Sequence, residues 1–310
     1  MAQPRSRNPN TFANSPLDRA SHRRVDAAWL KARLEDDRSL FLPLWRLMPF
    51  ISGTGAARQA GWMRMGLAET LIKDETAIFL GIANDSAHFA VDLGQGGSDP
   101  AQTMPLQGLG AFEDLRSVAG TIDAGDAAIL AQAKSLIDWH QRHRFCANCG
   151  ARTAMADAGY KRFCERCETE HFPRTDPVVI MLAIHGNRCL LGRQPKWPQG
   201  FYSALAGFVE PGETIEEAVA RELFEESAIK AGLVQYHSTQ PWPYPSSLMI
   251  GCFAEALSTD IQVDTTELEE ARWFTKEELR DALAGQGPIR CPPPLAIAHQ
   301  LIKTWIEFTG

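Results

Sequence analysis

Residues 207–229 of this 310-residue chain read GFVEPGETIEEAVARELFEESAI. Glu222 and Glu226 stand four positions apart, so a helix over residues 214–230 places them on one face, with Glu225 beside them. Carboxylates this close repel one another unless a cation neutralises them, and a merely solvated acidic face, the alternative, usually intersperses lysines. The pattern therefore favours a helix that binds hard divalent ions such as Mg²⁺ or Mn²⁺, which typically serve phosphate substrates.

The sequence around this helix mixes strands with further helices. Thr214 followed by Glu217 is a capping box, which marks the start of the helix. We expect strands at 39–44, 76–82, 88–93, 177–184, 188–192, 202–209, 248–255 and 271–274, and helices at 123–143, 275–284 and 295–308. This order of elements predicts a layered α/β domain in the second half of the chain.

Four of the seven cysteines form two Cys-x-x-Cys pairs that are separated by fourteen residues: Cys146, Cys149, Cys164 and Cys167. Such pairs can turn four thiolates to one centre, which suits tetrahedral zinc, and Gly150 favours the tight turn after the first pair. Because sulfur fills all four positions, we expect a structural metal. A pair of redox dithiols is the alternative, and a ribbon of this kind can also bind nucleic acid, although acidic residues dilute its basic ones.

The quoted stretch resembles the Nudix box, which is a glycine, five residues, Glu, seven residues, then Arg-Glu-apolar-x-Glu-Glu-x-Gly-apolar. The residues in register are Gly207, Glu213, Arg221, Glu222, Leu223, Glu225, Glu226 and Ile229. Ala228 stands where the family has glycine, and we expect a backbone adjustment there rather than a loss of activity. The resemblance implies a Nudix fold, an α/β/α sandwich.

A second motif resembles the Ser-Gln-Pro-Trp-Pro-Phe-Pro-x-Ser array of the NADH pyrophosphatases, a subfamily that also has a zinc ribbon before its Nudix domain. Residues 239–247 read TQPWPYPSS, with Thr for Ser and Tyr for Phe. The resemblance implies an N-terminal α+β domain over 1–135, a zinc ribbon over 136–172 and a Nudix hydrolase domain over 173–310. For the first domain we expect a scaffold or dimerisation role.

The array makes physical sense as a stiff recognition loop. Its prolines reduce the entropy lost on binding, and Trp242 and Tyr244 can stack on a nicotinamide or adenine ring. Gln240 and Ser247 can form hydrogen bonds with ribose or amide groups. The alternative is a surface loop of prolines and aromatic residues, or a polyproline II segment that binds a partner. By resemblance the substrate-binding residues are Gln240, Pro241, Trp242, Pro243, Tyr244, Pro245, Ser246 and Ser247, together with Phe172, Phe208 and Ala298. For the two phenylalanines a plain core position is the alternative.

The resemblance also implies the ligands of several Mg²⁺ or Mn²⁺ ions: Glu222, Glu225, Glu226, Glu267 and the carbonyl of Ala206. Arg221 would pair with these acids and hold their rotamers. Glu226 is our first choice of general base, and an acid on a neighbouring loop is the alternative. An exposed loop acid without a metal is the alternative for Glu267. One structural Zn²⁺ per chain would occupy the four cysteines.

The activity implied is hydrolysis of the pyrophosphate bond of NAD(H) to nicotinamide mononucleotide and AMP, and the removal of NAD caps from RNA 5′ ends by the same chemistry. The sequence leaves open which of the two substrates is used. Another nucleotide diphosphate, such as ADP-ribose or a dinucleoside polyphosphate, and a non-catalytic nucleotide sensor are the alternatives. By resemblance we also expect a homodimer.

Net charge and the lengths of the apolar runs indicate which classes of partner the sequence disfavours. The chain has 38 acidic and 31 basic residues, a net charge of −7, which disfavours a protein that coats nucleic acid or anionic lipid. The longest apolar run, 178–184, is too short to cross a bilayer, so we expect no membrane partner. Residues 1–24 are rich in arginine and proline, which favours a solvated lead-in over a transit peptide. We therefore expect a cytoplasmic protein.

Overall fold

A computed structural model describes residues 8–71 and 77–307. The chain divides into two compact units. The described residues of unit 1 fall within Met1–Thr11, Thr175–Trp242 and Ser247–Gly310, and those of unit 2 within Phe12–Arg174 and Pro243–Ser246. The strand expected at 76–82 and the helix expected at 295–308 each extend by one residue outside the described ranges.

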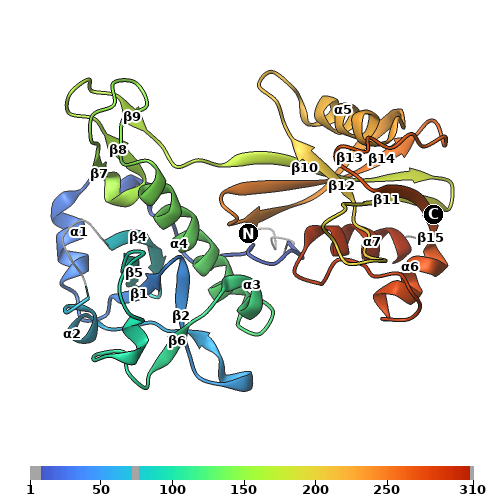
Figure 1. The fold of residues 1–310 in the computed structure, drawn as a ribbon. Helices are drawn as coiled ribbons and strands as arrows, with labels where there is room; N and C mark the ends of the chain where they lie inside the picture. Colours follow the sequence, from blue (N-terminus) through green and yellow to red (C-terminus); the bar gives the residue numbers. More distant parts are fainter. Residues whose placement is uncertain (1–7, 72–76, 308–310) are drawn as a thin grey trace, which may run out of the picture. The chain divides into compact units, whose positions relative to one another are not determined.

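Unit 1 is built on a six-stranded mixed sheet (Figure 1). Its strands are β10 (Asp176–His185), β11 (Arg188–Arg193), β12 (Leu205–Phe208), β13 (Ala231–Trp242), β14 (Ser247–Ala256) and β15 (Glu270–Thr275). The order is β13-β14-β10-β11-β15, and β12 pairs with β10. The pair of β10 with β14 is parallel, and the other pairs are antiparallel. The continuous apolar run of β10 fits this central position, because both faces of the strand are covered.

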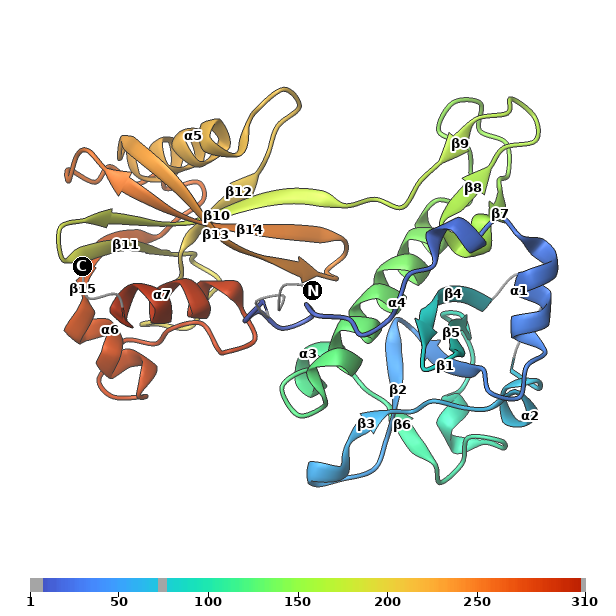
Figure 2. The same cartoon turned by 180° about the vertical axis from the view of Figure 1, so that it is seen from behind.

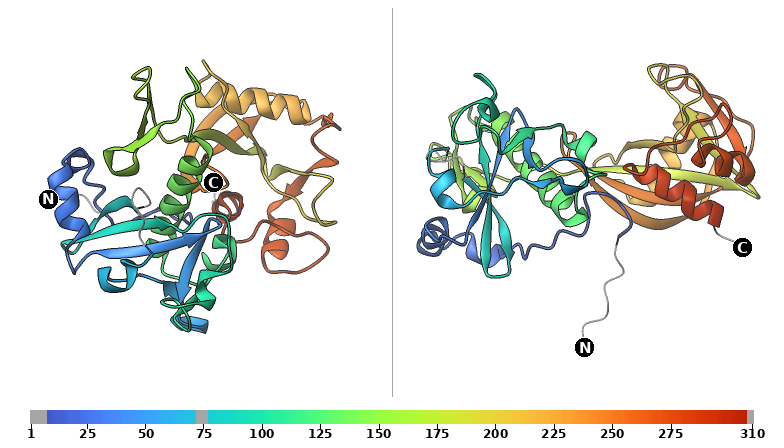
Figure 3. Two further views of the ribbon diagram at one scale, coloured as in Figure 1. Left: turned by 60° about the vertical axis from the view of Figure 1, so that its left-hand side comes forward. Right: turned by 90° about the horizontal axis from the view of Figure 1, so that it is seen from below.

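Helices cover both faces of this sheet, as Figures 1 and 2 show. They are α5 (Ile215–Ser227), α6 (Lys276–Leu283) and α7 (Ile297–Glu307). Met181 of β10 packs in one core cluster with Leu223 of α5, whereas its neighbour Leu182 packs in another with Leu301 of α7. Figure 3 shows α5 and α7 on opposite faces of the sheet from another direction. The three layers confirm the predicted α/β/α sandwich.

Helix α5 begins as predicted and ends earlier than predicted. Thr214 is its N-cap, and the capping box with Glu217 is formed in both directions, with N–H···O distances of 3.2 and 2.7 Å. The helix ends at Ser227 because Ala228 adopts a left-handed conformation with φ of 58° and ψ of 13°. The adjustment expected at Ala228 is therefore a left-handed C-cap.

The twelve-residue strand β13 was not predicted. Two register shifts interrupt its pairing with β14, and the apolar Leu233 and Tyr236 are each 63% exposed, so its sequence lacks a regular alternation. The expectation that the whole proline-rich array forms a stiff recognition loop is wrong in part. Residues 239–242 form the end of β13 and pair with β14, and only residues 243–246 form a turn.

Unit 2 begins with an α+β domain. Its strands are β1 (Leu40–Trp45), β2 (Met48–Ser52), β3 (Gln59–Ala60), β4 (Ala77–Ala83), β5 (Ser86–Asp92) and β6 (Gly110–Phe112), in the order β3-β2-β1-β5-β4 with β6 beside β2. Its helices are α1 (Ala27–Leu34), α2 (Met65–Ala68), α3 (Leu115–Val118) and α4 (Ala124–Arg142), with short 3₁₀ turns η1 (Ser21–Arg23), η2 (Gly55–Ala57) and η3 (Pro100–Gln102). Stacked and edge-on rings of Phe41, Phe79 and Phe89 fill the core.

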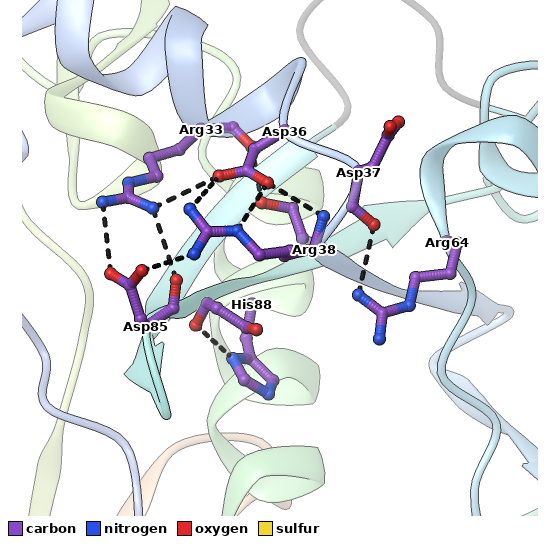
Figure 4. A network of polar contacts seen from close by, with 9 residues as sticks. Arg33, Asp36, Asp37, Arg38, Arg64, Asp85 and His88 are labelled. Carbon is purple, nitrogen blue, oxygen red and sulfur yellow. Dashed lines mark hydrogen bonds and ion pairs between the residues drawn. The ribbon is translucent and has the colours of Figure 1, made fainter.

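A polar network holds the turn between β4 and β5 to the start of β1 (Figure 4). Arg38 donates to Asp36 at 2.9 Å and to Asp85 at 2.6 Å, and Arg33 reaches the same two carboxylates. The hydrogen bonds from Arg38 lower the pKa of Asp36 to about 2. Because Arg38 and Asp85 are largely exposed, this network orients the turn more than it stabilises the fold.

Helix α4 continues into the cysteine-rich segment, which contains β7 (Ala154–Ala156), η4 (Asp157–Gly159), β8 (Lys161–Phe163) and β9 (Glu170–His171). The helix runs through residues 135 and 136, where we place the first domain boundary. His140 of α4 donates through Nε2 to the Gly159 carbonyl at 2.8 Å and accepts at Nδ1 from Arg162 at 2.9 Å. Burial lowers the pKa of His140 to about 4, so the ring is neutral and can accept that bond.

Candidate active site and zinc site

The structure brings the four predicted zinc ligands together. The sulfurs of Cys146, Cys149, Cys164 and Cys167 all lie within 4.8 Å of one another. The distance between the sulfurs of Cys146 and Cys167 is 3.6 Å, and that between Cys149 and Cys164 is 3.5 Å. Four convergent thiols without an open position are the donor set of a structural zinc ion, so the residues fit the metal that their spacing predicts.

Each cysteine pair lies on the same type of turn. The Gly150 N–H donates to the Cys146 carbonyl at 2.9 Å, and the Glu168 N–H donates to the Cys164 carbonyl at 2.8 Å. Both donors have positive φ angles, 75° for Gly150 and 58° for Glu168. The first turn therefore uses glycine where left-handed backbone is required, as the sequence predicts, whereas the second uses a glutamate.

On the other unit, Arg221 organises the acidic cluster of α5. Its five N–H donors are all directed at protein oxygens. Two bind the Glu213 carboxylate at 2.6 and 2.8 Å, one binds Glu222 at 2.8 Å, one binds Glu225 at 3.0 Å and one binds the Phe208 carbonyl at 2.9 Å. The paired bonds to Arg221 lower the pKa of Glu213 to about 2. Arg221 thus fixes the carboxylates, as predicted by resemblance.

Glu226 lies at the centre of the cluster and is only 5% exposed. Its Oε2 atom is buried and has no hydrogen-bond partner in the described structure. Burial, together with the charges of Glu222, Glu267, Asp264 and Glu225, raises the pKa of Glu226 to about 8. An unpaired buried carboxylate surrounded by other acids is costly unless a cation neutralises it.

Glycine at position 207 allows α5 to approach β12 closely. A Cβ atom there would overlap the Glu222 carboxylate, so only glycine leaves room for this side chain. Burial raises the pKa of Glu222, and the bond from Arg221 opposes the shift. The first glycine of the Nudix-like stretch is therefore a steric requirement of the acidic cluster rather than of a turn.

A loop after β14 brings Glu267 to the cluster. The Asp264 N–H donates to the carbonyl of Glu226 at 3.2 Å, and the Asp264 side chain accepts from the N–H and hydroxyl of Thr266, both at 2.8 Å. The Glu267 N–H in turn donates to the Asp264 carbonyl at 3.2 Å. The sequence interpretation included Glu267 but missed Asp264 and Thr266. Their signal is the Asp-x-Thr pattern, which forms a local turn just before Glu267.

The acidic side chains have the chemistry of ligands for a hard divalent cation, but among the described residues the four cysteines alone form a close cluster of three or more ligand atoms. The donors are carboxylate oxygens from Glu222, Glu226 and Glu267, with Glu225 at the exposed side of the helix. The buried, unpartnered oxygen of Glu226 and the repulsion among the acids are what such an ion relieves. Metal binding by these acids stays a prediction, which the raised pKa of Glu226 favours.

Family comparisons account for three segments of the chain. Residues 174–290 match the NUDIX domain, residues 141–172 match the NADH pyrophosphatase zinc ribbon domain, and residues 38–139 match the NADH pyrophosphatase-like rudimentary NUDIX domain. The protein named "NAD-capped RNA hydrolase NUDT12" from Homo sapiens is 40% identical over 339 residues, covering 96% of this chain and 73% of that protein. This chain belongs to the Nudix hydrolases.

Within that family it belongs to the subfamily of NADH pyrophosphatases and NAD-capped RNA hydrolases. "NAD(P)H pyrophosphatase NUDT13, mitochondrial" from Homo sapiens is 40% identical, and the match covers 75% of this chain and 72% of that protein. "NAD-capped RNA hydrolase NudC" from Chromobacterium violaceum is 38% identical, and the match covers 73% of this chain and 78% of that protein. Membership confirms the resemblance inferred from the box, the ribbon and the array.

The proline-rich array of this Nudix hydrolase has a different environment at each position. Gln240 is 1% exposed, and its amide binds main-chain groups of the protein. Tyr244 belongs to unit 2, where the Arg116 guanidinium lies 3.9 Å and the Lys134 ammonium 5.2 Å from the ring centroid. Trp242 is half-buried and Pro243 is buried. Substrate contacts for the array residues, Pro241 and Pro245 to Ser247 included, stay predictions.

The other predicted contacts also differ in accessibility. Phe172 in unit 2 is 62% exposed and Phe208 in unit 1 is 59% exposed, so neither is a core residue. Exposed phenylalanines of this kind favour the binding role over the core alternative. Ala298 is 2% exposed and packs in the core cluster of α7. Ala206, whose carbonyl is a predicted metal ligand, pairs with Ile180 in the sheet and packs partly against that same cluster.

The close approach at Gly207 gives a direct test of the cluster. We expect Gly207→Ala to lower kcat about 10- to 100-fold, because the methyl group displaces the Glu222 carboxylate without disturbing the core. The melting temperature should stay within a few degrees. Steady-state kinetics and thermal melting measure both. Gly66→Ala, at an open helical position, is the control and should change neither; a fully active Gly207→Ala enzyme would contradict the steric account.

Glycine in place of Ala228, at the left-handed C-cap of α5, should stabilise the protein. We expect Ala228→Gly to raise the free energy of unfolding by about 0.5–1 kcal/mol, because glycine adopts this conformation without a Cβ clash. Turnover should be unchanged, since the substitution lies outside the carboxylates. Chemical denaturation measures the first effect and initial rates the second. A less stable variant would show that the left-handed backbone carries no strain.

Proposed function

We propose that this enzyme hydrolyses the pyrophosphate bond of NAD(H), giving nicotinamide mononucleotide and AMP. One observation carries the chemistry. The buried Glu226 carboxylate has an unpartnered oxygen beside Glu222 and Glu267, a site that fits the hard cations used in phosphoanhydride hydrolysis. The substrate follows from relatives named for NAD-capped RNA and for NAD(P)H, because their matches cover most of this chain.

In the proposed reaction, the protein positions charge and accepts a proton. Mg²⁺ or Mn²⁺ held by Glu222, Glu226 and Glu267 would neutralise the diphosphate charge and lower the pKa of the attacking water. Arg221 holds Glu222 and Glu225 in place, so the acids need no rearrangement when substrate arrives. Glu226 accepts the proton of the water, whose oxygen bonds to one phosphorus while the bridging P–O bond breaks. The bridging oxygen leaves with the other phosphate.

Removal of an NAD cap from RNA is the second proposed activity. The bond that breaks is the same, because the transcript extends from the adenosine ribose and leaves the diphosphate unchanged. Two of the relatives above are named for this reaction. A homodimer and a cytoplasmic location stay predictions of the sequence. Within the described ranges, no helix has the length and apolar character needed to span a bilayer.

One assay tests the proposal. The purified protein is incubated with NADH and Mg²⁺ or Mn²⁺, and the products are separated by chromatography. We expect equimolar nicotinamide mononucleotide and AMP, with no products after chelation of divalent ions. The ratio of kcat/KM for NADH and for NAD-capped RNA then decides between the two substrates. Turnover of ADP-ribose without turnover of NADH or capped RNA would overturn the proposal.

A further inference from the structure

The chain near its start contributes to the Nudix unit. Residues 8–11, here called the strap, lie against β13 within unit 1. The Asn8 side chain donates to the Thr239 carbonyl at 2.8 Å. The Asn10 amide donates to the same carbonyl at 2.9 Å and to the Ser238 hydroxyl at 2.8 Å. Asn10 is 4% exposed, so these bonds form in a buried environment, where lost partners are costly.

Gln240 joins the strap to helix α7. Its Nε2 atom donates to the Thr11 carbonyl at 3.1 Å and to the Leu295 carbonyl at 2.8 Å, and its Oε1 accepts from the N–H of Ile297 at 2.8 Å. Ile297 is the first residue of α7, so this oxygen satisfies a donor that the helix itself cannot. Both Nε2 hydrogens are used within the protein, which leaves no amide donor for a substrate.

A second connection from β13 reaches α7 at Thr304, about two helical turns after Ile297. His237 lies between the Ser238 hydroxyl at 2.7 Å and the Thr304 hydroxyl at 3.1 Å. Ser238 also binds Asn10, so the strap, β13 and α7 share one continuous set of hydrogen bonds. The helix is therefore held at its first turn by Gln240 and near its end by His237.

The first turn of α7 is coupled by packing to strand β12, which precedes the acidic cluster. Ile297 and Ala298 belong to the core cluster on their face of the sheet, and Ala206 of β12 packs against the same cluster. Ala206 directly precedes Gly207, the residue that faces the Glu222 carboxylate. A displacement of the first turn would thus reach β12 through close-packed side chains.

We propose that Gln240 is a positioning residue, which with the strap fixes the first turn of α7 and thereby sets substrate affinity. This differs from the hydrogen-bonding role to ribose or amide groups that its place in the array suggests. The effect on affinity rests on the proposed function, whereas the effect on α7 does not. Gln240 acts through Ile297 and Ala298.

The test compares three variants of the full chain. Gln240→Met keeps the shape and removes all three bonds, Asn10→Ala loosens the strap outside the array, and Gln235→Met is the matched control, an exposed glutamine on the same strand. We expect Gln240→Met to raise KM for NADH about tenfold, with a smaller effect on kcat because Arg221 still holds the Glu222 carboxylate. Asn10→Ala should raise KM by a smaller factor in the same direction, and Gln235→Met should leave it unchanged.

Hydrogen exchange provides the readout that needs no turnover. The Ile297 amide should exchange faster in Gln240→Met and in Asn10→Ala, and at the parent rate in Gln235→Met. An unchanged Ile297 amide in Gln240→Met would overturn the proposal, and so would a raised KM in Gln240→Met with Asn10→Ala at the parent value, since that result indicates direct substrate contact. Failure of the parent enzyme to hydrolyse NADH would instead overturn the proposed function. The exchange rate of the Ile297 amide would then still test whether Gln240 and the strap fix the first turn of α7.

Discussion

Replacement of Glu226 by glutamine is expected to lower kcat for NADH at least about 10³-fold, because it removes both the buried negative charge that attracts the cation and the proposed proton acceptor. The side chain keeps its shape, so the core around α5 should be intact. Initial rates at saturating Mg²⁺ or Mn²⁺ measure the effect. Glu216→Gln, an exposed acid in the first turn of the same helix, is the matched control and should retain full activity.

Glu226→Gln, although it lowers activity, should raise the stability of the enzyme when divalent ions are absent. Burial raises the pKa of Glu226 from 4.5 to about 8, so the folded state binds a proton that the unfolded state has lost between these two pH values. The free energy of unfolding of the metal-free enzyme therefore falls as pH rises from 4.5 to 8. Glu226→Gln removes this dependence and should stabilise the metal-free protein at pH 8 by on the order of 3 kcal/mol.

Thermal melts with and without Mn²⁺ separate the two effects. Addition of the ion should raise the melting temperature of the parent enzyme at pH 8 and should barely change that of Glu226→Gln, because ligand binding stabilises only the state that binds. Substantial turnover by Glu226→Gln would place the chemistry on another group. An equal Mn²⁺ response in both proteins would place the cation elsewhere.

The local sequence pattern predicts those parts of the site that depend on nearby residues. The positions of Glu222 and Glu226 follow from helical periodicity, and the cysteine pairs follow from their spacing. The start of α5 follows from its capping box, which is a contact over three residues. Each of these features is determined by residues close together in the sequence, so it can be predicted from one short segment.

Features that depend on distant segments could not be predicted in this way. Strand β13 contains two register shifts and has exposed apolar residues, so its sequence lacks the alternation of polar and apolar residues that predicts a strand. Its pairing with β14 fixes its conformation instead. Gln240 lies in a motif that suggests substrate binding, yet its side chain donates to the carbonyls of Thr11 and Leu295, which are 229 and 55 residues away in the sequence. The raised pKa of Glu226 likewise depends in part on a loop 38 residues later, whose Asp264 donates its N–H to the Glu226 carbonyl.

Replacement of Cys164 by serine is expected to abolish zinc binding and to lower the melting temperature of unit 2 by about 10 °C, because structural zinc contributes folding free energy directly. Cys164 is fully buried, and its sulfur lies 3.5 Å from that of Cys149. Loss of the metal should free the strands β7 to β9 and, through Arg162 and His140, loosen the end of α4. Metal analysis should show one zinc per parent chain and none in the variant.

Cys291→Ser is the matched control, because Cys291 lies in unit 1 outside the four-cysteine cluster. It should keep one zinc and the parent melting temperature of unit 2. Thiol titration decides between zinc and the redox alternative: with zinc bound, the four cluster thiols react slowly, and a mercurial reagent releases the metal as they react. Full zinc content in Cys164→Ser, or reversible disulfide formation between the pairs in the native enzyme, would contradict a structural zinc site.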